Sequence, residues 1–118
     1  MKEKGKYINL EYLENISGGS KSLVKEMVEI FLEQVPEFTK EMKELLAKKD
    51  YQSLGLLAHK AKSSVAIMGM NELAEDLKDF EHLAKEMKDV ERYPSYIERF
   101  ERSCYEAILE LNEIIENL

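Results

Sequence analysis

The chain has 118 residues, of which 44% are hydrophobic and 35% are charged, a balance typical of a folded, mostly helical protein and not of a disordered one. Its 24 acidic and 17 basic residues give a formal net charge of -7, which argues against nucleic acid or an anionic membrane surface as the partner. The single cysteine, Cys104, cannot form an intrachain disulfide or a thiolate cluster around zinc.

The start of the chain, MKEKGKYINLEYL, lacks the unbroken apolar core of a secretory signal. No later run approaches the roughly 20 apolar residues that span a bilayer. We therefore expect a cytoplasmic protein with no membrane partner. Because no linker, internal repeat or low-complexity tract divides the sequence, residues 1–118 are predicted to form a single domain.

The first half of the chain predicts two amphipathic helical segments after the turn sequence SGGS at 17–20. Hydrophobic residues repeat there at i, i+4, i+7 and i+8, first at Leu23, Met27, Ile30 and Phe31 and then at Phe38, Met42, Leu45 and Leu46. Pro36 lies between the two groups. Proline disrupts the interior of a helix, so we expect a break near this residue.

The second half predicts three longer helices, each with one apolar face. Asp50 is expected to cap the first of them, and Gly69 to form the turn that ends it. Pro94 suits the first turn of the last helix. The three apolar faces are Leu54, Ala58, Ala61, Val65 and Met68; Leu73, Leu77, Phe80, Ala84 and Met87; and Ile97, Phe100, Cys104, Leu111 and Leu118.

The fold class that these patterns predict is all-α. No stretch alternates apolar and polar residues for long enough to form a convincing strand. Short connections between helices favour antiparallel neighbours, so we expect an antiparallel up-and-down four-helix bundle with short additional N-terminal helical segments. A bundle that buries its apolar stripes need not associate, and we expect a monomer.

His59 is the first candidate functional residue because of the direction in which it points. At about 100° per residue, the apolar side chains of its helix cluster within roughly 40° of a common direction. His59 lies about 140° from that direction on the same helical wheel. Its ring is therefore expected to project into solvent and not into the core.

The residues one or two turns from His59 have almost no side chain. They are Gly55 at i-4, Ser63 at i+4 and Ala66 at i+7. Glycine inside a helix costs about 1 kcal/mol relative to alanine, so helix stability does not explain Gly55. We expect a low, open rim around the imidazole that lets another protein approach closely.

Lys62, three residues after His59, is expected to reach the space above the imidazole. There its ammonium would pair with a phosphoryl group and disfavour a second positive charge on the ring. Both effects favour a histidine that accepts phosphate.

Other chemistries find less support in the sequence. His82 also lies on a polar helix face, but Lys78, Asp79, Lys85 and Glu86 crowd it, so we interpret it as an ordinary surface histidine. No HExxH or ExxH motif predicts a metal site. Ser63 and Ser64 lack a G-x-S-x-G elbow, and no Gly-rich phosphate loop is present, so neither a hydrolase nor a nucleotide site is predicted.

The segment AHKAKSSVAIMG, residues 58–69, resembles the signature of histidine-containing phosphotransfer (HPt) domains of bacterial multistep phosphorelays. The family pattern has a histidine, a lysine three residues later, two small residues and a glycine ten residues after the histidine. Those positions here are His59, Lys62, Ser63, Ser64 and Gly69. The fourth residue after the histidine is more often glycine in the family, and here it is Ser63. Residues 7–38 and 73–86 are similar to the family's entry segment and following helix.

The resemblance implies a phosphorelay intermediate: His59 accepts a phosphoryl group from a receiver-domain aspartate and passes it to another receiver domain. Lys62 would give electrostatic support, and Gly69 would form a structural turn. Partner-binding residues would be Gly55, Ser63, Ala66 and Gln52. The chain would be a phosphocarrier and not an enzyme, with no cofactor or metal of its own, because the receiver would bring Mg²⁺ and the catalytic machinery. Implied partners are response-regulator receiver domains and a hybrid sensor histidine kinase.

Two alternative functions remain open. A helical adaptor could bind a receiver or another signalling partner through the same face without carrying phosphate. The dimerisation segment of a sensor kinase would also place a histidine on a bundle helix. That segment needs a nucleotide-binding domain after it, and the acidic residue and proline that usually follow its histidine are missing here.

Overall fold

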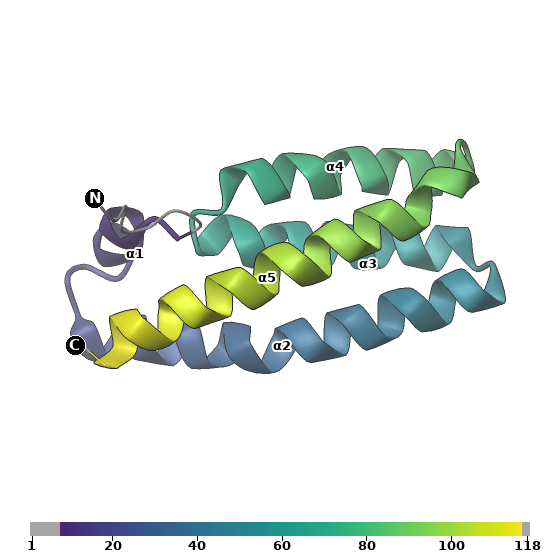
Figure 1. The fold of residues 1–118 in the computed structure, drawn as a ribbon. Helices are drawn as coiled ribbons and strands as arrows, with labels where there is room; N and C mark the ends of the chain where they lie inside the picture. Colours follow the sequence, from purple (N-terminus) through teal and green to yellow (C-terminus); the bar gives the residue numbers. More distant parts are fainter. Residues whose placement is uncertain (1–7, 117–118) are drawn as a thin grey trace, which may run out of the picture.

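The computed structural model describes residues 8–116, and the regular structure in this range is helical (Figure 1). The prediction of an all-α fold with a short N-terminal helix is confirmed for these residues. Tyr7 and Leu118, which the sequence patterns included, lie outside the described range. The elements are α1 (Leu10–Ile16), α2 (Lys21–Lys48), α3 (Tyr51–Ile67), α4 (Asn71–Glu86), the 3₁₀ helix η1 (Val90–Arg92) and α5 (Tyr93–Glu116).

Short polar side chains begin three of the helices. The side chains of Asn9, Ser20 and Asp50 accept hydrogen bonds from backbone amides in the first turns of α1, α2 and α3. The predicted cap at Asp50 is therefore confirmed, with its carboxylate 3.2 Å from the amide nitrogen of Ser53. Such a cap stabilises a helix by about 1 kcal/mol.

Gly69 forms the predicted turn between α3 and α4. Its φ of +78° lies in the left-handed region, where residues with a Cβ are strained. A Cβ at this position would also lie 2.5 Å from the Cβ of Asn9. Two independent constraints, the turn and the close passage of the chain before α1, therefore favour glycine at position 69.

The expected break at Pro36 is wrong, because α2 runs without interruption through this residue. Pro36 is exposed, while Phe31, Val35 and Met42 on either side of it are buried in the same core. Each such burial stabilises the fold by about 1.5–3 kcal/mol, and a proline inside a helix costs about 3 kcal/mol. Packing on both sides of the proline therefore outweighs its cost.

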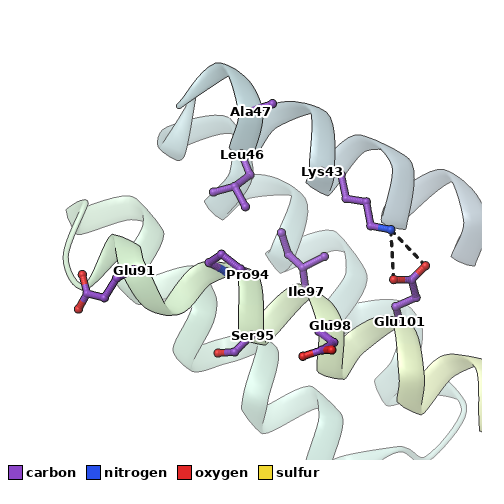
Figure 2. A pocket seen from close by; sticks show the side chains of 9 residues that line it. All are labelled: Lys43, Leu46, Ala47, Glu91, Pro94, Ser95, Ile97, Glu98 and Glu101. Carbon is purple, nitrogen blue, oxygen red and sulfur yellow. Dashed lines mark hydrogen bonds and ion pairs between the residues drawn. The ribbon is translucent and has the colours of Figure 1, made fainter.

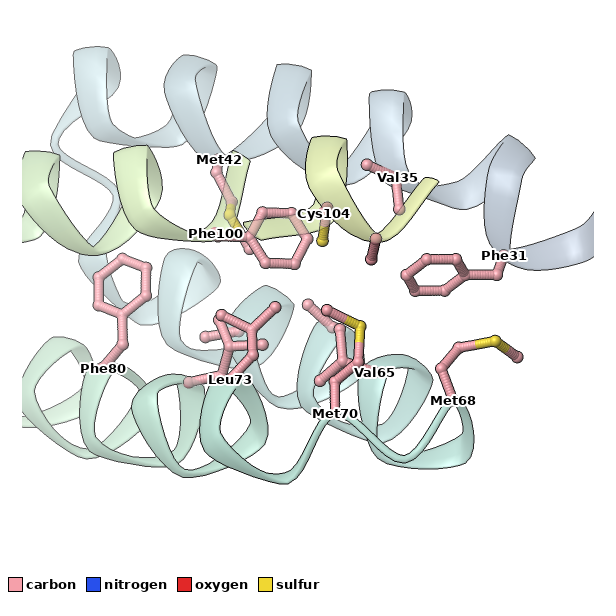
Figure 3. Close-up of a cluster of buried hydrophobic side chains, with 14 of the residues drawn as sticks. Phe31, Val35, Met42, Val65, Met68, Met70, Leu73, Phe80, Phe100 and Cys104 are labelled. Carbon is pink, nitrogen blue, oxygen red and sulfur yellow. The ribbon is translucent and has the colours of Figure 1, made fainter. Parts of the chain in front are cut away.

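The core lies between α2 and α5 on one side and α3 and α4 on the other, as the side chains in Figure 3 show. The predicted apolar faces of α3 and α5 are buried in the described range. The apolar face predicted for the first part of α2 is wrong in part. Leu23 and Ile30 are exposed, and Val24 and Val28 occupy the core instead. Met87, which was predicted on the apolar face of α4, is also exposed. It is the residue with left-handed backbone angles that caps the end of α4.

Helices α2 to α5 lie lengthwise beside one another, and α1 lies at the end where α2 begins and α5 ends (Figure 1). Helix α2 contacts α3 and α5, and α4 contacts the same two helices. The α3–α4 pair makes the most extensive contact. Side chains that leave the facing edges of α3 and α4 are therefore held close together.

A groove of about 670 Å³ lies between the end of α2 and the start of α5 (Figure 2). Its apolar part is formed by Leu46, Ala47, Pro94 and Ile97. The Lys43 ammonium at its edge pairs with Glu101 at 3.2 Å. His59 does not line this groove.

Candidate functional site

His59 projects from α3 with its side chain 54% exposed, as the sequence predicts. Leu54, Ala58 and Ala61 of the same helix face the core and are completely buried. Because the core fixes this face of α3, the opposite face that carries His59 is held toward solvent. The imidazole is thus accessible on a rigid element.

Glu81 of α4 contacts the Nδ1 side of the His59 ring. The Nδ1 atom of His59 lies 3.1 Å from each carboxylate oxygen of Glu81, whose side chain is only 8% exposed. A carboxylate can only accept a hydrogen bond, so this contact requires a proton on Nδ1. In the neutral ring the lone pair then belongs to Nε2. The contact therefore selects the tautomer whose outer nitrogen is a nucleophile.

Two lysines share the same carboxylate. The Lys85 ammonium lies 2.7 Å from Oε2 of Glu81, and the Lys62 ammonium lies 3.6 Å from Oε1. Burial by itself raises the pKa of Glu81, but the hydrogen bonds from Lys85 and His59 and the charges of both groups outweigh it. The pKa of Glu81 falls to about 2 as a result. Glu81 is thus an anion at neutral pH.

Lys62 occupies a different place from the one expected. It lies near the ring, but its ammonium contacts Glu81 beside the imidazole. The expected electrostatics were also incomplete, because a carboxylate between the lysine and the ring offsets the positive charge of the lysine. The ring therefore lies next to a charge network that contains both signs.

The rim residues divide into two groups. Ser63 is exposed and its hydroxyl lies 3.4 Å from the carbonyl oxygen of His59, while Ala66 is half-buried. Gly55 is buried, so the expectation of open surface at this residue is wrong. A Cβ on Gly55 would meet Lys85 Cγ at 2.8 Å and two backbone atoms of α4 at 3.3 Å. Gly55 therefore allows α4 to approach α3.

Gln52 is exposed two turns before His59, and its amide Nε2 donates a hydrogen bond to the carbonyl oxygen of Lys85 at 2.7 Å. This hydrogen bond joins the Gln52 side chain to the backbone of α4. His82 is exposed on α4, as expected for a surface histidine.

Glu81 and Lys85 were missed as site residues. A signal for Glu81 exists in the sequence: it lies between Leu77 and Ala84 in the apolar repeat of its helix, where a carboxylate needs a partner. Lys85 carries no comparable signal, because charged residues crowd that end of α4. Sequence periodicity alone does not reveal which residue of α3 faces each of them.

Residues 8–116 offer neither a metal site nor a membrane-spanning helix. No group of three or more His, Cys, Asp or Glu side chains in this range could hold a metal ion. None of the described helices combines the length and the apolar character needed to cross a membrane.

A family model described as "Hpt domain" matches residues 26–118, a range that contains α3 and α4 with His59 and Glu81. Neither a curated protein nor a solved structure matched the chain.

Proposed function

The chain belongs to the Hpt domain family, whose members carry phosphoryl groups in phosphorelay signalling, and we propose that His59 is its phosphoryl-accepting residue. The donor in this proposal is the aspartyl phosphate of a receiver domain, and a second receiver domain takes the group away. The observation that carries the proposal is the pairing of a half-exposed ring with a buried carboxylate on Nδ1. Such a pairing leaves Nε2 accessible and nucleophilic.

This geometry supports the following transfer. The Nε2 lone pair attacks phosphorus, the N–P bond forms, and the P–O bond to the aspartate breaks so that aspartate leaves as a carboxylate. The proton on Nδ1 stays in its hydrogen bond to Glu81, which stabilises the positive charge that develops on the ring. The reverse step passes the group to the next receiver. Mg²⁺ belongs to the receiver in this proposal, and this chain acts as a phosphocarrier without a cofactor.

The surface around His59 suits a docked partner. Leu56 and Ile67 expose apolar side chains on α3 on either side of the histidine, and Ser63 lies between them. In-line transfer requires the donor phosphorus to come within a few ångströms of Nε2, and short side chains permit this approach. Ser63 and Ala66 are therefore proposed to contact the receiver. Gln52 and Gly55 are proposed to support the site through Lys85.

The scaffold in this proposal is an antiparallel up-and-down bundle of α2 to α5, formed by residues 1–118 as one monomeric, cytoplasmic domain. The short connections between these helices and the neighbour contacts of α2 with α3 and α5 support this arrangement. The receiver domains of response regulators, and of a hybrid sensor histidine kinase, are the proposed partners.

The test is labelling by a phosphorylated receiver domain. The wild-type chain should gain a phosphate that is labile in acid and stable in base, and His59→Gln should gain none. His82→Gln is the matched control and should label like the wild type. Equal labelling of the His59→Gln variant would refute the assignment. A receiver that binds the chain without labelling it would instead favour the adaptor function.

A further inference from the structure

Lys85 lies beside the phosphoryl-accepting ring, and its side chain is more covered and makes a closer ion pair than that of an ordinary surface lysine. Its ammonium makes the shortest of the three contacts to Glu81, at 2.7 Å. Its side chain is 40% exposed, so part of the stem is covered. By contrast, Lys88 near the same end of α4 is 69% exposed and meets Glu86 at 3.6 Å.

Two residues of α3 accommodate Lys85. Gly55 leaves the space that the Lys85 stem fills, since a Cβ there would lie 2.8 Å from Cγ. Gln52 fixes the backbone of Lys85 through its 2.7 Å hydrogen bond to the carbonyl oxygen. The Lys85 side chain therefore crosses α3 one turn before His59.

Lys62 leaves α3 one turn after His59, so the two lysines flank the ring along the helix axis. Side chains lean toward the N-terminus of their own helix. Lys62 therefore leans toward His59, and Lys85 leans toward Glu81, which holds the ring. Each ammonium contacts the carboxylate of Glu81, and the same carboxylate contacts Nδ1 of His59.

We propose that Lys85 is the second phosphoryl-binding cation of this site, and that it binds the phosphoryl group on His59 from the side opposite Lys62. The proposal rests on the proposed function of His59. A phosphoryl group brings a charge of about -1.5 to -2 and three acceptor oxygens, whereas Glu81 offers one negative charge to three donors. Rotation about the terminal bonds of the lysine stem moves its ammonium from Glu81 to the phosphoryl oxygens. Glu81 keeps its bond to Nδ1 of the ring.

The experiment needs no partner protein. Phosphoramidate, a small phosphoryl donor, labels histidine as its P–N bond breaks and ammonia leaves. A His82→Gln background leaves His59 as the one histidine in the chain. The phosphorus NMR signal of phosphohistidine is then followed through the second ionisation of the phosphoryl group. A neighbouring cation favours the dianion and so lowers the pH midpoint of that ionisation.

Lys85→Met keeps the stem without the charge, and should raise this midpoint by about half a pH unit or more. Lys85→Arg should restore it toward the wild-type value. Lys88→Met, the matched control, should leave it unchanged. Equal midpoints for Lys85→Met and Lys88→Met would overturn the role of Lys85 while leaving His59 as the acceptor. Absence of phosphohistidine in the His82→Gln chain would contradict the function of His59 and the proposal together.

Discussion

His59 and Glu81 are joined by a forked contact, in which Nδ1 of the imidazole lies 3.1 Å from both oxygens of the carboxylate. The two residues are 22 positions apart in the sequence and come from the facing helices α3 and α4. The contact fixes the orientation of the ring and the position of its proton. The same carboxylate also pairs with the ammonium groups of Lys62 and Lys85, which places both lysines near the ring.

The first prediction concerns this contact. Glu81→Gln keeps an acceptor for Nδ1 but removes the charge that stabilises the ring as it becomes cationic. The rate at which phosphoramidate labels His59 should fall about tenfold, the loss expected for a hydrogen bond to a charged group. Glu86→Gln removes an exposed carboxylate of the same helix and should not change the rate. An unchanged rate in Glu81→Gln would separate Glu81 from the chemistry.

The second prediction separates docking from reactivity. Ser63→Arg places a long side chain on the exposed face beside His59. Transfer from a phosphorylated receiver should slow by about tenfold or more, because the donor phosphorus no longer reaches in-line geometry. Labelling by phosphoramidate should change by less than about twofold, and the free energy of unfolding by less than about 0.5 kcal/mol.

The control for Ser63→Arg is Asn112→Arg, which adds the same charge at an exposed position of α5. It should leave transfer from the receiver unchanged. If both variants slowed transfer equally, added charge and not the surface around His59 would account for the effect.

The outward direction of His59 was predictable from sequence because it depends on the period of a single helix. Glu81 and Lys85 were not found in this way, because their contacts depend on how α3 and α4 are aligned with each other. Gly55 shows the difference most clearly: its small size was noticed, and its neighbours were misjudged. The residue that fills the space beside it, Lys85, lies 30 positions later in the chain.

The third prediction follows from the burial of Gly55. On an exposed helix surface, Gly→Ala would stabilise the protein by about 1 kcal/mol. Here the new Cβ would press on the backbone of Glu81 and Lys85 at 3.3 Å, so Gly55→Ala should lower the free energy of unfolding by about 1 kcal/mol. Urea denaturation measures the change. Ser63→Ala on the same helix is the control and should stay within about 0.5 kcal/mol of wild type. Stabilisation by Gly55→Ala would contradict the close approach of α4.

The fourth prediction is a pH dependence of stability. The pKa of Glu81 is lowered from 4.5 to about 2 in the folded chain, so its ionised form favours folding. The stability that this group contributes is present above about pH 4.5 and is lost as the pH falls toward 2, and it amounts to about 3 kcal/mol at most. Denaturation at pH 5 and pH 3 should therefore show the gap between wild type and Glu81→Gln becoming smaller in acid. A gap that stays constant would mean that Glu81 is not held as an anion.

The last prediction concerns Pro36 in the interior of α2. The proline has no N–H to donate to the carbonyl of Leu32, and its ring crowds the same carbonyl, at a cost of about 3 kcal/mol. Proline also restricts the unfolded chain, which returns about 1 kcal/mol of stability. Pro36→Ala should therefore raise the free energy of unfolding by about 1–2 kcal/mol in urea denaturation. Glu37→Ala, at the next exposed position, is the control and should change it by less than about 0.5 kcal/mol. A loss of stability in Pro36→Ala would mean that the proline shapes α2 so that Val35 and Thr39 reach the core, and that its cost in the helix is offset there.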